Sequence, residues 1–268
     1  MSERPPHAAA TIAALADPTL VSDGGDGFCV RSLAVTYRDG SGEQPHRHSW
    51  GQLVYGVSGV IRVSLDRAAW LAPPTRAIWV PPGVTHALSM RGIVAMRTLY
   101  IAPAWAQSLP ARASVLEVEP LLRELILHIL KIGMLSAADA PQARIAGFLV
   151  DVLAEARPHD LMLPLPADRR ALALCEAVQG APHDRRGLAS LAREAGASLR
   201  TLQRLFPAET GLSLDAWRQK ARLIHAAAAL GSGASVTTAA LDCGYDSPSA
   251  FITAFKRQFG VTPGRYRA

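Results

Sequence analysis

The last hundred residues contain the same helix–glycine–helix pattern twice, and this repeat restricts the fold more than any other feature. In the first copy a short apolar helix pattern ends at Gly196, and Ser198 stands where it can cap a second helix. In the second copy Gly244 and Ser247 take the matching positions, and Pro248 follows at the first helical position, where its missing N–H costs nothing. The repeat predicts two helix-turn-helix units in an all-α C-terminal domain.

The segment between the two units predicts one long helix. We place the units at about 188–209 and 236–259, inside a domain that spans 168–268. Leu214–Leu230 has helical periodicity over about 17 residues, or roughly 26 Å. A helix of that length can hold two reading helices about one DNA turn apart, roughly 34 Å, on one side of a duplex.

The positive charge of the chain lies entirely in this part. Residues 1–167 contain 14 Lys and Arg and 14 Asp and Glu, whereas residues 168–268 contain 14 and 8, so the net charge of +6 is C-terminal. A basic excess suits nucleic acid, an acidic membrane or an acidic protein. Together with the helix-turn-helix pattern, it favours double-stranded DNA as the partner.

The C-terminal segment also resembles a known family. From about Leu188 to Tyr266 it is similar to the AraC/XylS transcription regulators, through "SLRTLQRLF…ETGLSLDAWRQKARL" and, more specifically, "CGYDSPSAFITAFKRQFGVTPGRYR". The resemblance implies two helix-turn-helix subdomains joined by a long helix. It also implies sequence-specific regulation of transcription, with RNA polymerase as a further candidate partner.

Polar side chains off the apolar stripe of each second helix are the candidates for DNA contact. Arg can bridge guanine O6 and N7, and Gln can bridge adenine N6 and N7, so the first unit should supply most of the sequence discrimination. The second helix has no Arg, Asn or Gln in its first two turns and should mainly position the protein. For any single arginine, a solvated helix face is the alternative. The predicted contacts are Ser198, Arg200, Gln203 and Arg204 in the first unit, and Ser249, Thr253 and Lys256 in the second.

The N-terminal half has a different character, because short β patterns alternate with turns rich in Gly and Pro. Many short, evenly spaced strands favour an antiparallel sandwich or barrel. The predicted strands are Cys29–Tyr37, Gln52–Val57, Val60–Leu65, Ala77–Val80 and Val94–Ile101.

Three histidines and a glutamine in this half form a second constellation. His46 and His48 are two residues apart and Gln52 is four further on, so an unbroken strand would turn all three to one face. His86, on a neighbouring strand, would complete a pocket able to hold a divalent ion.

The same span resembles the cupin family in its two motifs, "HRHSWGQLVYGVSG" and "PPGVTH". The resemblance implies a double-sheet β-barrel, placed at 26–105, whose metal-binding members use two His, a Glu and a further His. Gln52 stands at the Glu position, and a neutral amide is a weaker ligand than a carboxylate. Two alternatives follow: a divalent transition metal (Zn, Ni, Co or Cu), or a metal-free pocket whose histidines hydrogen-bond an organic effector.

The remaining segments complete the domain plan. Two amphipathic helices are predicted at Val118–Ile132 and Gln142–Ala156, within 106–157. They cover an open face of the barrel, pair with a second subunit in a homodimer, or do both. Three prolines mark 158–167 as a linker, and 1–25 as an N-terminal arm precedes the barrel.

Other features argue against several classes of protein. The chain has no run of 18 apolar residues, which argues against a membrane span, and the N-terminus lacks the pattern of a secretion signal. We therefore expect a cytoplasmic protein. Its three cysteines have unpatterned spacings, which predict neither a disulfide framework nor a Cys-based zinc site.

These observations predict an α+β two-domain protein, in which a cupin-like domain with two helices senses a small molecule or metal ion and an all-α domain binds specific DNA. The alternative is a metal-dependent cupin enzyme fused to a DNA-binding domain. No paired carboxylates accompany the histidine motifs, so we expect no enzyme and assign no catalytic residue. A purely architectural DNA-binding protein fits poorly with a reading helix rich in base-reading side chains.

Overall fold

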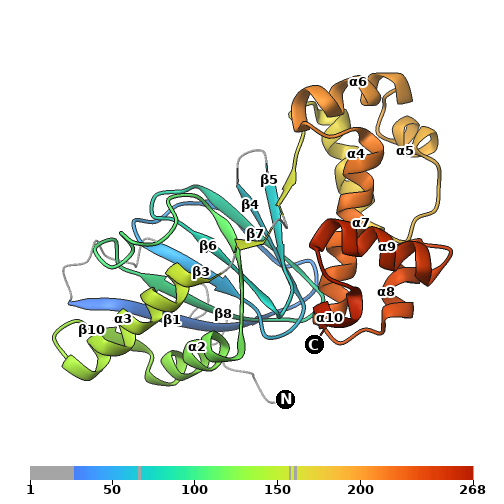
Figure 1. The fold of residues 1–268 in the computed structure, drawn as a ribbon. Helices are drawn as coiled ribbons and strands as arrows, with labels where there is room; N and C mark the ends of the chain where they lie inside the picture. Colours follow the sequence, from blue (N-terminus) through green and yellow to red (C-terminus); the bar gives the residue numbers. More distant parts are fainter. Residues whose placement is uncertain (1–26, 66–67, 157, 160–161, 268) are drawn as a thin grey trace, which may run out of the picture. The chain divides into compact units, whose positions relative to one another are not determined.

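The computed structural model describes residues 27–65, 68–156, 158–159 and 162–267, so the predicted N-terminal arm lies outside the described residues. The chain forms two compact units (Figure 1). The first comprises Met1–Leu65 and Pro74–His159, and the second comprises Asp66–Pro73 and Asp160–Ala268.

The first unit is built on antiparallel strands in two sheets, as predicted for the N-terminal half. One sheet has the order β10-β1-β8-β3-β6-β9-β11, and β4, β7 and β2 are neighbours in the other. The strands are β1 (Phe28–Tyr37), β2 (Gly42–His46), β3 (Gly51–Tyr55), β4 (Val60–Leu65), β6 (Arg76–Val80), β7 (His86–Arg91), β8 (Val94–Ile101), β9 (Ser114–Glu117), β10 (Met134–Ser136) and β11 (Pro158–His159).

Two helices cover the outer face of the larger sheet, α2 (Pro120–Ile132) and α3 (Ala140–Glu155) (Figure 1). Their buried side chains share one apolar cluster with odd-numbered residues of β3. Each fully buried Leu or Ile in such a cluster contributes about 1.5–3 kcal/mol. The cluster includes Leu53, Tyr55, Trp79, Leu122, Ile126, Leu149 and Leu153. The two predicted helices therefore form, and they cover the barrel.

All five residues of β3 are buried, because the odd-numbered positions face the helices and the even-numbered positions face the interior of the barrel. Leu53 packs under the helices, whereas Gln52 and Val54 point to the opposite side of the strand, toward the interior of the barrel. This alternation places a polar side chain, Gln52, inside the barrel.

The second unit begins with a pair of short strands. β5 (Ala68–Ala72) pairs antiparallel with β12 (Met162–Pro164), with Met162 opposite Trp70. Part of the predicted linker 158–167 therefore has regular structure, in β11 and β12. Proline is compatible with short edge strands because it removes a single ladder donor, and here Pro158 begins β11 and Pro164 ends β12.

Helices form the rest of the second unit, as predicted. They are α4 (Arg169–Gly180), α5 (Leu188–Glu194), α6 (Leu199–Thr210), α7 (Leu214–Gly231), α8 (Val236–Asp242), α9 (Pro248–Phe259) and α10 (Pro263–Arg267). Gly196 and Gly244 have φ of 73° and 74°, a left-handed conformation that favours glycine. Ser198 accepts a hydrogen bond from the N–H of Thr201, and Ser247 caps α9 in the same way. Both predicted turns and caps are confirmed.

The connector helix α7 is the centre of this unit. Near its start Trp217 is fully buried, stacks edge-on against Phe206 of α6, and donates its indole N–H to the backbone carbonyl of Pro164 at 2.6 Å. Further along, Leu223 and Ala227 share an apolar cluster with α8, α9 and α10. One helix therefore supports both helix-turn-helix units.

Candidate functional site: a DNA-reading surface and a histidine cluster

The reading helix of the first helix-turn-helix unit, α6, is oriented by its apolar stripe. Leu202 and Phe206 are fully buried, so the opposite face of the helix is turned to solvent. Arg200, Gln203 and Arg204 are exposed there. Long polar side chains on one exposed face can reach base edges in the major groove.

Ser198 has a structural role beside any DNA contact. Its hydroxyl accepts from the Thr201 N–H at 3.1 Å and is 2.8 Å from the Thr201 hydroxyl. The side chain is exposed, and it satisfies one of the unpaired N–H groups at the start of α6.

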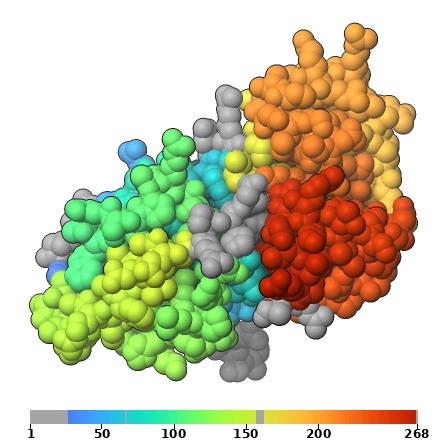
Figure 2. All heavy atoms as spheres, viewed as in Figure 1, coloured from blue at the N-terminus to red at the C-terminus, as the bar shows by residue number. Residues whose placement is uncertain are grey.

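The reading helix of the second helix-turn-helix unit, α9, has the same construction. Phe251 and Phe255 are fully buried, while Ser249, Thr253 and Lys256 are exposed. The Thr253 hydroxyl donates to the Ser249 carbonyl at 3.0 Å, which leaves its oxygen lone pairs but not its proton for another contact. In the space-filling view both helix-turn-helix units, orange for the first and red for the second, are at the surface (Figure 2).

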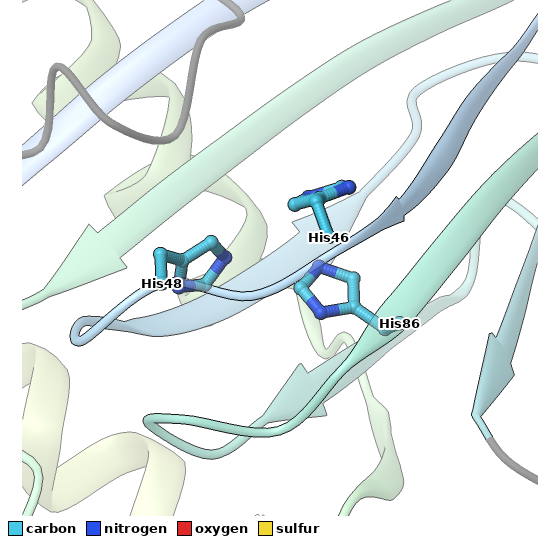
Figure 3. Close-up of side chains that lie close together, drawn as sticks. All are labelled: His46, His48 and His86. Atoms are coloured by element: carbon cyan, nitrogen blue, oxygen red, sulfur yellow. The ribbon is translucent and has the colours of Figure 1, made fainter.

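The second site lies in the N-terminal compact unit, where three histidines from two segments of the chain converge (Figure 3). His46 ends β2, His48 lies in the bend that follows, and His86 begins β7. Their candidate ligand nitrogens all lie within 4.8 Å of one another. The chain bends between His46 and Gly51, so the condition of an unbroken strand is not met, although the side chains still meet.

Gln52 contacts two of the three histidines, His48 and His86, and is fully buried. Its Nε2 donates to the hydroxyls of Thr98, at 3.1 Å, and Tyr100, at 3.2 Å. The Thr98 hydroxyl gives its own proton to the Leu53 carbonyl, so it can only accept from Gln52. The carbonyl oxygen of Gln52 is thereby turned toward the histidines.

Each histidine has its Nδ1 against a backbone carbonyl. The distances are 2.8 Å from His46 to Gln44, 2.6 Å from His48 to Trp50 and 2.9 Å from His86 to Val84. Because a carbonyl only accepts, these three hydrogen bonds require the proton on Nδ1, and that tautomer leaves Nε2 with a lone pair, as in metal-ligating histidines.

Burial sets the protonation of the two inner rings. His48 is 6% exposed and His86 is 1% exposed. Desolvation lowers the pKa of His48, and it lowers the pKa of His86 to about 4 with smaller contributions from the neighbouring histidines. Both rings are therefore neutral near pH 7.

Several residues of this site were not identified from the sequence. Thr98 and Tyr100 come from β8, and burial raises the pKa of the Tyr100 hydroxyl, which keeps it a neutral hydrogen-bonding group. Glu43 is the other addition, because its Oε2 lies 3.8 Å from Nε2 of His46 and its Oε1 accepts from the Tyr37 hydroxyl. A register shift between Glu43 and His46 brings this carboxylate to the edge of the site, a feature that residue spacing does not reveal.

Comparison with known proteins assigns the chain to a family. Residues 33–163 match the description "AraC-like ligand binding domain", and residues 191–268 match "Helix-turn-helix domain". The HTH-type transcriptional regulator NimR of Escherichia coli K12 is 35% identical over 223 residues, which cover 83% of this chain and 81% of NimR. The chain belongs to the AraC family of transcription regulators. It is a DNA-binding regulator with a ligand-binding domain.

The two sites of this AraC-family regulator fall inside the two matched domains. His46, His48, Gln52 and His86 lie in the ligand-binding match, and the seven predicted DNA contacts lie in the helix-turn-helix match. The HTH-type transcriptional regulator RipA of Corynebacterium glutamicum is also similar, with 37% identity over 38% of this chain and 31% of RipA. Within the described residues, no helix is both long enough and apolar enough to cross a membrane.

Solved structures similar to this regulator include ToxT of Vibrio cholerae O395, with 12% identity, 89% of this chain and 97% of that chain covered, and a TM-score of 0.39. The DNA-binding domain of AdpA in complex with a target DNA is 32% identical, with 38% and 91% covered and a TM-score of 0.35.

Proposed function

We propose that this regulator responds to a divalent transition metal, Zn, Ni, Co or Cu, held by the three histidines and the carbonyl oxygen of Gln52. Occupancy of the site favours one conformation of the chain over another and so changes its affinity for DNA. Imidazole nitrogen suits all four metals, and an amide oxygen adds a fourth, weaker ligand.

The observation that supports this proposal is that several hydrogen-bond acceptor atoms lie against one another in the cluster. Oε1 of Gln52 lies 2.8 Å from Nε2 of His86 and 3.2 Å from Nε2 of His48. With Nδ1 protonated and the rings neutral, these contacts join lone pair to lone pair without a hydrogen between them. Moving the proton to Nε2 would only transfer the same conflict to the backbone carbonyl. A bound cation satisfies all of these lone pairs together.

A metal-free pocket is the competing proposal, because the same lone pairs could accept hydrogen bonds from an organic effector with N–H or O–H groups. The two proposals differ in what purified protein contains. An organic effector would leave the pocket free of metal under all loading conditions.

The test is the metal content of untagged protein purified without chelator, measured by mass spectrometry. We expect near-stoichiometric metal in the wild type and in His128→Ala, which removes an exposed histidine of α2, but not in His86→Ala. Metal absent from all three, even after supplementation with each of the four ions, would contradict the metal proposal and favour an organic effector.

We also propose that the protein is a sensor and not an enzyme. The carboxylate of Glu43 lies at the edge of the cluster, 3.8 Å from Nε2 of His46, and is not paired there with a second carboxylate in any contact of the described residues, whereas general acid–base chemistry commonly uses two positioned groups. A sensor returns its ligand unchanged, so ligand recovered after incubation should be chemically identical to ligand supplied.

The proposed assembly is a homodimer formed through α2 and α3, with double-stranded DNA and RNA polymerase as further partners. Support comes from large apolar side chains left exposed on these helices, Leu121 at 57% and Phe148 at 47%. Val152 lines the same cavity as Leu121, with three glutamates beside them, and is one helical turn from Phe148.

A further inference from the structure

The segment that leads into the first helix-turn-helix unit is held by two arginines of the connector helix. Arg218 donates through Nη2 to the backbone carbonyls of Asp184 and Arg186, both at 2.8 Å, and Arg222 donates to the Asp184 carbonyl as well. Because the acceptors are backbone atoms, these bonds fix the path of the chain before α5. We call residues 184–187 the lead-in segment.

The lead-in segment is in turn fixed to α5. The carboxylate of Asp184 accepts from the backbone N–H of Arg186 at 2.9 Å and from its Nε at 2.8 Å. Arg186 then reaches Glu194, at the end of α5, with 2.8 Å between Nη1 and Oε2. A shift of the lead-in segment would therefore move α5, against which the reading helix α6 packs.

One of the two connector-helix arginines also lies next to the turn of the second helix-turn-helix unit. The guanidinium of Arg222 lies against Gly244, where a Cβ would come within 3.3 Å of Nη2. Next to it, Arg185 of the lead-in segment forms an ion pair with Asp246, at 3.0 Å, just before α9. The lead-in segment thus connects the start of one helix-turn-helix unit to the turn of the other.

The connector helix alone does not provide this link. By chain order, α7 joins the end of α6 to the start of α8, and the chain reaches α5 from α7 only by way of α6. The bonds from Arg218 and Arg222 join α7 directly to the segment before α5. Both guanidiniums are partly buried and their Nε atoms have no hydrogen-bond partner, so their position is determined by these carbonyls and by packing.

We propose that Arg218 and Arg222 are positioning residues that set the separation of the two reading helices, and thereby the spacing between the two DNA elements that the protein accepts. When two linked modules are held rigidly, they bind two DNA elements at one matching spacing with high combined affinity. Loosely held modules bind that spacing more weakly but also accept other spacings.

The experiment compares operators that differ only in spacing. The full-length protein first selects its operator from random DNA, and 1 and 2 base pairs are then inserted or deleted between the two elements. We expect the wild type to lose about tenfold or more in affinity on changing the spacing. Arg222→Met should bind the selected operator about tenfold more weakly but lose little more on the altered ones.

Two further variants give the matched comparisons. Arg193→Ala removes an exposed arginine of α5 outside these contacts and should keep the wild-type spacing preference. Arg222→Lys keeps the charge but offers one compact donor group in place of a planar fork, so its spacing preference should fall between those of the wild type and Arg222→Met.

An equal loss of affinity on every operator would overturn the proposal, because it would make Arg222 a plain DNA contact or a general stability residue. An unchanged spacing preference would overturn it as well. Should Arg222→Met fail to fold by circular dichroism, Asp246→Ala serves in its place, since that side chain is 89% exposed and its loss does not disturb the core. It should weaken the spacing preference, and a full wild-type preference would count against the proposed link.

Discussion

At the residue scale, the histidine cluster depends on a hydroxyl outside it. Thr98 accepts from Gln52 and donates to a backbone carbonyl, so it determines which end of the amide faces the histidines. Thr98→Val keeps the shape and removes this acceptor. We expect metal affinity to fall about 10–100-fold, the usual effect of losing a partner that orients a ligand.

The measurement for Thr98→Val is competition with a chelator of known affinity, and Thr98→Ser, which keeps the hydroxyl, is the control. Equal metal affinity in the wild type and both variants would show that Gln52 is not a ligand in the bound state.

A second residue-scale prediction concerns the reading helix. Arg204 is exposed on α6 opposite the buried Leu202, where it can bridge guanine O6 and N7. Arg204→Ala should weaken operator binding by about 1–3 kcal/mol and relax the base preference at one position. Competition binding on operator and random DNA measures both, with Arg144→Ala, an exposed arginine of α3, as control. Equal losses on the two DNAs would instead make Arg204 a phosphate contact.

The sequence predicts only part of the histidine site, for a physical reason. His46, His48, Gln52 and His86 are found because they lie in two short motifs. Thr98 is 46 residues from Gln52 and meets it only through the pairing of β3 with β8. Contacts made by sheet pairing leave no local spacing to recognise, and the bend after His46 likewise follows from tertiary packing.

At the scale of elements, the sequence predicts strongly patterned segments and does not reveal weakly patterned ones. The connector helix is predicted at Leu214–Leu230 and forms at Leu214–Gly231, because its apolar stripe is long and its start is capped. β2 has the sequence GEQPH, which is polar and contains a proline, so its propensity gives no strand signal. The five-residue helix α10 is too short for a periodic pattern.

Alanine substitutions at two glycines of the N-terminal compact unit should have opposite effects on its stability. A Cβ on Gly51 would lie 2.1 Å from Cη2 of the buried Trp79, whose indole is also fixed by a hydrogen bond to Pro110. Gly51→Ala should therefore lower the free energy of unfolding by about 1–3 kcal/mol.

Gly147 is the contrasting position, inside α3 with its nearest neighbour 4.0 Å away on Trp105. Gly147→Ala should raise the free energy of unfolding by about 0.5–1 kcal/mol, since alanine loses less backbone entropy in a helix. Chemical denaturation followed by circular dichroism measures both variants, and stabilisation by Gly51→Ala would contradict the packing described for Trp79.

At the scale of the whole molecule, the proposed dimer rests on the apolar surface of α2 and α3. Phe148→Glu places a charge on that surface and should shift the protein from dimer to monomer in sedimentation equilibrium. Ile93→Glu, which alters an apolar side chain 71% exposed in the turn between β7 and β8, should leave the dimer intact. A dimer that survives Phe148→Glu together with Leu121→Glu would mean that another surface joins the subunits.

Operator affinity with and without metal shows whether occupancy of the histidine cluster changes DNA binding. The protein is stripped with chelator, reloaded with the ion that it retains on purification, and titrated with operator in both states. We expect the dissociation constants to differ at least about fivefold for the wild type, a typical coupling between two sites, and to be equal for His86→Ala. Equal constants for stripped and fully loaded wild-type protein would contradict the proposed function and leave the metal without a regulatory role.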